Sequence, residues 1–148
     1  MKKEDKELLF KDLCARLPYG VAVLSDIDKE FDGGLIGMLC RVEPYVGEKY
    51  KKLEGQYLLY QHGCFTPYTV EEVRPYLRPI SSMTDEERED FFKNDGVMSH
   101  NPNTDTWSIT SFTIKGIDWL NKHHFDYRGL IERGLAIEPK NELKDIYK

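Results

Sequence analysis

A stretch near the carboxyl end concentrates the side chains most suited to chemistry, with aromatic, imidazole, carboxylate and guanidinium groups close together. An imidazole suits proton transfer and ligand binding because its pKa lies near neutrality. In a functional interpretation, His123 or His124 is a general base or a donor to a ligand, and Asp126 orients its ring. Trp119 and Arg128 add a ring face and a cation to the same candidate site.

The same residues also suit a structural corner between two helices. A histidine at a helix C-terminus is favoured by the helix dipole, and Asp126 is then the cap of the next helix. Arg128 would pair with a carboxylate in this interpretation. The sequence favours the structural interpretation, because such a corner needs capping residues whether or not it does chemistry.

A second candidate site carries Arg74, Tyr76 and Arg78 on the segment 70–79, which two prolines stiffen into an extended connector. Two guanidinium groups on a rigid segment would clamp an anion such as a phosphate. If the ligand is a nucleotide, Tyr76 or Trp119 should offer a ring face to the base. The alternative, which the pattern favours, is that both arginines form ion pairs with the acidic helix at 85–90.

The sequence predicts neither a bound metal nor a cofactor. Adjacent histidines on a helix point about 100° apart, so His123 and His124 do not share a metal ion. The three cysteines, Cys14, Cys40 and Cys64, are far apart and lack CxxC spacing. We expect reduced thiols, most of them buried.

The first half of the chain alternates between one helical stretch and short β-type runs. Leu9, Leu13 and Leu17 recur at four-residue spacing, which predicts a helix over 4–17 with one face on a core. Short strands do not persist alone, so we expect a small antiparallel, barrel-like sheet packed by this helix. The predicted strands are 19–24, 35–42, 57–60 and 64–68.

The second half is predicted to contain short helices. Thr84 and Glu87 have the spacing of a capping box, in which each side chain bonds the backbone amide of the other residue. A helix over 85–93 should follow. The remaining predictions are a mobile loop at 97–106, a strand at 107–114, and helices at 116–124 and 127–133. Together these elements predict an α+β fold.

Length and composition bound the class of protein. The chain has 148 residues, 40% of them hydrophobic, which predicts one globular domain over 1–148. The net charge of −5 argues against nucleic acid as the partner. Because no stretch is apolar enough for a bilayer and the N-terminus lacks a signal region, we expect a cytoplasmic protein without membrane contact.

Three segments carry a resemblance to a known family: LCARLPYGV at 13–21, VRPYLRPISSMT at 73–84, and WLNKHHFDYRGLI at 119–131. They resemble a family of small proteins, without an assigned activity, from gut anaerobic bacteria and their phages and mobile elements. The resemblance implies an accessory protein of a mobile element. Small phage accessory proteins are often binders that block a host defence.

The leading hypothesis is a non-catalytic binding protein of a phage or mobile element. Its binding surface is predicted to combine the connector at 74–78 with the corner at 123–128. Its partner would be a host protein, or a nucleotide-like small molecule that serves as a defence signal. Two alternatives stay open. One is a phosphodiesterase-like hydrolase that uses His123, His124 and Asp126, and the other is a self-associating structural subunit of a larger particle.

Overall fold

The structure is a computed structural model that describes residues 1–25, 35–46, 56–63, 67–140, 143 and 145–147. Cys64 and most of the predicted strand at 64–68 lie outside these residues. The chain divides into two compact units, Met1–Tyr76 and Leu77–Lys148, and each is described by itself. A single domain over 1–148 stays a prediction.

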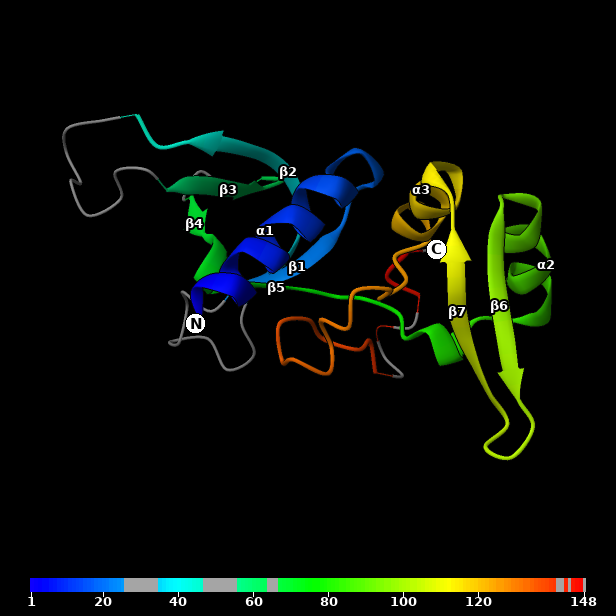
Figure 1. Cartoon of the computed structure of the whole chain (residues 1–148). Coiled ribbons are helices and arrows are strands. Elements are labelled where there is room, and N and C mark those ends of the chain that lie inside the picture. Colours follow the sequence, from blue (N-terminus) through cyan, green and yellow to red (C-terminus); the bar gives the residue numbers. More distant parts are fainter. Residues whose placement is uncertain (26–34, 47–55, 64–66, 141–142, 144, 148) are drawn as a thin grey trace. The chain divides into compact units, whose positions relative to one another are not determined.

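The first unit packs one helix on an antiparallel sheet (Figure 1). The helix α1 (Lys3–Arg16) leads through a 3₁₀ turn, η1 (Leu17–Tyr19), into the sheet. The sheet has the strand order β4-β3-β2-β1-β5, and no pairing among the described residues closes it into a barrel. The α+β class is confirmed. The strands are β1 (Ala22–Ser25), β2 (Leu35–Pro44), β3 (Tyr57–Gln61), β4 (Tyr68–Thr69) and β5 (Val73–Pro75).

The buried face of α1 confirms most of the leucine pattern. Leu9 and Leu13 are fully buried, whereas Leu17 is half-buried because the α-helix has already ended there. Arg16 continues the buried stripe and is held by Asp12, with Nε 2.7 Å from Oδ2 and Nη2 3.0 Å from Oδ1. A buried ion pair at this spacing keeps two charges inside the unit without leaving either one alone.

Two predictions about the first unit are wrong. Cys14 on α1 and Cys40 on β2 are exposed residues, not buried ones. The connector is also not extended throughout, since Val70–Glu72 form a 3₁₀ turn, η3, before β5. Glu72 Oε2 accepts the Thr69 backbone N–H at 2.7 Å, the same local pattern that was recognised at Thr84.

The second unit packs two helices and a turn against a β-hairpin (Figure 1). Its elements are η4 (Ile80–Ser82), α2 (Asp85–Lys93), β6 (Gly96–Asn101), β7 (Thr106–Phe112) and α3 (Ile114–Lys122). The core contains Met83, Phe91, Met98, Trp119, Leu120 and Phe125, with Trp107 and Ile109 packed against it.

The hairpin replaces the predicted mobile loop at 97–106. One of its faces carries Met98, Trp107 and Ile109 onto the core, and the other carries hydroxyl side chains such as Ser99 and Ser108. That alternation is the pattern of a half-buried strand. The polar residues of its exposed face made the segment resemble a loop in the sequence. The predicted helix at 127–133 is also wrong, because those residues form successive turns.

No helix in the described part of the chain is both long enough and apolar enough to cross a bilayer.

Candidate functional site

A cleft of about 580 Å³ opens on the second unit. Its lining includes Arg78, Ser82, Thr84, Glu87 and His123. The C-terminal segment contributes Glu138 and Tyr147.

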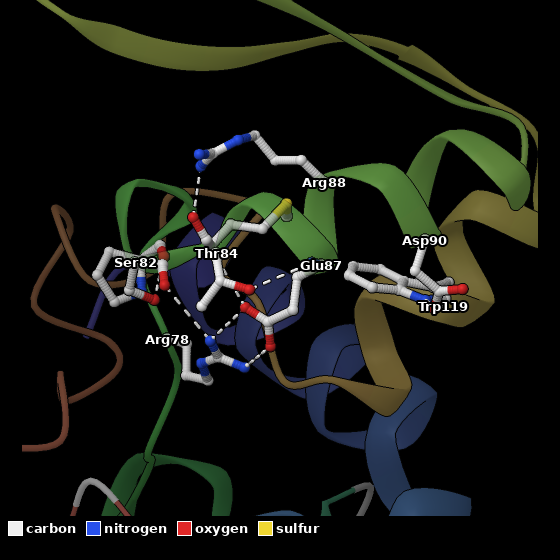
Figure 2. Close-up of polar contacts among 9 residues, drawn as sticks. Arg78, Ser82, Thr84, Glu87, Arg88, Asp90 and Trp119 are labelled. Carbon is white, nitrogen blue, oxygen red and sulfur yellow. Dashed lines mark hydrogen bonds and ion pairs between the residues drawn. The ribbon is translucent and has the colours of Figure 1, made fainter.

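Arg78 is held by contacts of its guanidinium, some of which Figure 2 shows, and of its backbone. Its guanidinium pairs with Glu87 through two bonds, Nη1 to Oε1 at 2.7 Å and Nη2 to Oε2 at 2.8 Å. The Cζ atom lies 4.3 Å from the centroid of the Phe125 ring. The backbone N–H donates to the carbonyl of His124 at 2.9 Å, and the backbone carbonyl accepts from the N–H of Asp126 at 2.7 Å. The Arg78 head is therefore a rigid donor group at the cleft wall.

Glu87 connects Arg78 to the start of α2. Its Oε2 also accepts the Thr84 backbone N–H at 2.9 Å, and Thr84 Oγ1 accepts the Glu87 N–H at 3.2 Å. This confirms the predicted capping box. Burial acts to raise the pKa of Glu87, but the hydrogen bonds from Arg78 and Thr84 outweigh it, so the pKa is lowered. Glu87 is thus held as a carboxylate.

His123 is the C-cap of α3 and lies on an aromatic support. Its ring stacks on Trp119 with the centroids 4.1 Å apart and 24° between the planes. Trp119 is itself anchored, because its Nε1–H donates to Asp90 Oδ2 at 2.6 Å (Figure 2). Within the described residues, the His123 ring nitrogens have no hydrogen-bond partner. Burial lowers the pKa of His123, which keeps the free imidazole neutral near pH 7.

The two nitrogen-bearing groups of the cleft therefore rest on one buried aromatic cluster. Phe125, under the Arg78 guanidinium, lies nearly parallel to Trp119, with 8° between their planes and 5.7 Å between their centroids. Trp119 in turn supports His123. Because Phe125 and Trp119 belong to the core, the positions of both polar groups are set by packing and not by loop conformation.

Arg74 and Tyr76 lie in the first unit. The Arg74 guanidinium donates to the carbonyls of Glu71 and Val73, at 3.0 and 2.8 Å. The predicted ion pair with the acidic helix is thus seen for Arg78 alone among the described contacts. Neither predicted ring is open to a base, because Tyr76 and Trp119 are both buried.

The rest of the 123–128 corner is held by local bonds and ring contacts, and the helix that Asp126 was expected to cap is a series of turns over 127–133. Asp126 is buried, and its two carboxylate oxygens accept the backbone N–H groups of Leu130 and Ile131 at 2.9 and 2.8 Å. His124 has a left-handed backbone, with φ of 58°, and its buried ring stacks on Tyr147 at 3.7 Å. The Arg128 guanidinium lies 4.8 Å from the centroid of the Tyr127 ring.

Sequence reasoning missed the contribution of Ser82, Glu138 and Tyr147 to the cleft. Only Tyr147 gave a usable signal, as an aromatic residue in a tail that is otherwise largely charged. The other two are common surface residue types, and their position depends on how the chain folds back. Among the described residues, no three His, Cys, Asp or Glu side chains gather as a metal ion would require.

Comparison with protein-family models, with curated proteins and with solved structures finds no match for this chain.

Proposed function

We propose that this chain is a non-catalytic binding protein whose cleft in the second unit takes an anionic, nucleotide-like small molecule. The observation that carries the proposal is the placement of Arg78 and His123 in one cleft, each supported by a ring of the buried aromatic cluster. Recognition of an anion needs several donors at one place, and donors held in advance bind with less loss of entropy.

The ion pair with Glu87 leaves Arg78 able to bind. A guanidinium has five N–H groups, and the bidentate pair uses two of them. A third contact, to the carbonyl of Ser82, is long at 3.5 Å. Further N–H groups therefore remain for a ligand, and the hydroxyl-bearing residues Ser82 and Thr84 lie at the same wall.

The size of the cleft supports a small ligand. Its volume of about 580 Å³ falls within the range typical of small-molecule sites, about 300–1,000 Å³. Tyr147, whose ring stacks on His124, gives the cleft an aromatic wall in place of the rings expected at Tyr76 and Trp119.

The hydrogen bonds of the Asp126 and Glu87 carboxylates support binding without catalysis. Both oxygens of Asp126 accept backbone N–H groups, and both oxygens of Glu87 accept bonds from Arg78. In many hydrolases that use a histidine, a third group bonded to the ring orients it, and no carboxylate is bonded to the His123 ring among the described residues. The hydrolase is therefore the weaker hypothesis.

The biological setting forms part of the same proposal. The resemblance of the three segments supports an accessory protein of a phage or mobile element that acts in the host cytoplasm. There it would sequester a nucleotide signal of a host defence. Direct blocking of a host defence protein is the form of counter-defence that would survive if no nucleotide binds.

The test is isothermal titration calorimetry with cyclic dinucleotides and cyclic oligonucleotides. Arg78→Lys should weaken binding at least tenfold, because a lysine keeps the charge but loses the bidentate geometry. Arg41→Lys is the matched control: Arg41 also pairs with a glutamate, Glu43, and lies 4.0 Å over a tyrosine ring, but it belongs to the first unit. This control should bind like the parent protein.

Two results would change the conclusion. The absence of binding heat with every nucleotide would refute the sequestration hypothesis and leave a protein partner. Recovery of a cleaved nucleotide after incubation, with cleavage lost in His123→Gln, would show that the protein is a hydrolase.

A further inference from the structure

We infer that His123 takes up a proton when an anion binds in the cleft, so that its imidazolium and the Arg78 guanidinium hold the anion together. This inference rests on the proposed function and adds a pH dependence to it. It makes the affinity of the cleft a function of cytoplasmic pH.

The geometry that supports the inference is the way His123 is presented. The ring is fixed on Trp119, and Trp119 is fixed by its bond to Asp90, so the imidazole has little freedom to turn away from the cleft. Its two nitrogens have no hydrogen-bond partner among the described residues. A neutral imidazole has one N–H donor and an imidazolium has two, so protonation adds a donor where a ligand can use it.

Charges of both signs surround His123 in the free protein. Helix α2 contributes the carboxylates of Glu87 and Asp90, which favour the imidazolium. Lys122 on α3 and Arg78 on the segment before η4 oppose it, and Glu138 lines the same cleft. Burial, the largest effect, lowers the pKa of His123 and leaves the ring neutral. An anion bound beside the ring adds a negative charge that favours the imidazolium, in the same sense as Glu87 and Asp90.

The sign of the pH dependence follows from linkage. An anion beside the ring raises the pKa of His123 in the complex above its value in the free protein. Binding should therefore strengthen as the pH falls from above the pKa of the complex to below that of the free protein. A pKa that rises by one on binding corresponds to about tenfold tighter binding over that range.

The direct test is an NMR titration of the histidine rings in sodium sulfate, and in sodium chloride at equal ionic strength. Sulfate keeps its charge across the pH range of histidine, so the titrating group is on the protein. The midpoint of His123 should be higher in sulfate than in chloride. His100, which pairs with the exposed Asp105 at the hairpin turn, is the matched control histidine. Equal midpoints for His123 in the two salts would overturn the inference.

Calorimetry then separates this inference from the proposed function. A cyclic dinucleotide, whose phosphodiesters do not titrate near neutral pH, is bound at pH 7 in two buffers of different ionisation enthalpy. Net proton uptake that is present in the parent protein and in His100→Gln, but lost in His123→Gln, supports the inference. Binding without proton uptake refutes the inference and keeps the proposed function, whereas no binding at any pH refutes the proposed nucleotide ligand.

Discussion

Gly96 at the start of β6 offers a sharp test of how tightly the second unit is packed. A Cβ built on Gly96 would lie 2.2 Å from the Cε1 and Cζ atoms of the Phe91 ring. Ordinary Cβ contacts begin at 3.4 Å, so the ring would have to move by more than an ångström. Phe91 is fully buried, and its ring centroid lies 5.2 Å from that of Trp119, so there is little room for that movement.

We therefore expect Gly96→Ala to lower the free energy of unfolding by about 1–3 kcal/mol, the usual cost of overpacking a core. The backbone of Gly96 is not left-handed, so the loss would come from the clash and not from strain in φ. The replacement of a glycine also restricts the unfolded chain, which offsets up to about 1 kcal/mol of the loss.

The assay is urea unfolding followed by tryptophan fluorescence. Both tryptophans of the chain, Trp107 and Trp119, lie in the second unit, so the signal comes from that unit. Phe91→Leu provides a double-mutant cycle, because the smaller side chain leaves space for the added methyl group. The double variant should be less destabilised than the sum of the single variants. A Gly96→Ala midpoint equal to that of the parent protein, or strict additivity in the cycle, would refute the packing argument.

Three further predictions concern stability. Leu13→Ala should cost about 2–5 kcal/mol, since Leu13 is fully buried on α1; an unchanged urea midpoint by circular dichroism would show that α1 is peripheral. Thr84→Ala should cost about 1 kcal/mol through loss of the helix cap, and Thr84→Ser, which keeps the hydroxyl, should cost much less. The lowered pKa of Glu87 means that its ion pair with Arg78 stabilises the protein above the ordinary glutamate pKa. That contribution should be lost as the pH falls through the lowered pKa, and Glu87→Gln should flatten this part of the stability profile.

The elements that the sequence predicted well are those with local causes. The helix α1 follows from leucines four residues apart, and the start of α2 follows from Thr84 and Glu87, which lie three residues apart. In both cases the residues concerned are close neighbours along the chain, so their spacing in the sequence is enough to predict the helix. The bonds of Asp126 are also local, since its carboxylate accepts the amides four and five residues away, but they hold a series of turns and not the helix that was expected.

Other features depended on residues that are distant in the chain. The strand character of 97–106 comes from the burial of Met98 on a core built by Phe91 and Trp119, and a polar stretch does not reveal which of its faces will be covered. The need for glycine at position 96 likewise arises from the approach of the Phe91 ring.

The cleft in the second unit contains residues that the sequence identified, in an arrangement that only the folded structure supplies. The sequence by itself singled out Arg78 and His123 as residues able to bind, because a guanidinium and an imidazole carry donors of the right chemistry. The hypothesis from the sequence placed both on one binding surface, but no pattern indicated that Tyr147 would join them in one cleft. That grouping required Phe125 and Trp119 to stack in the core beneath them, and such packing is a property of the folded chain, since it joins side chains that no local pattern connects.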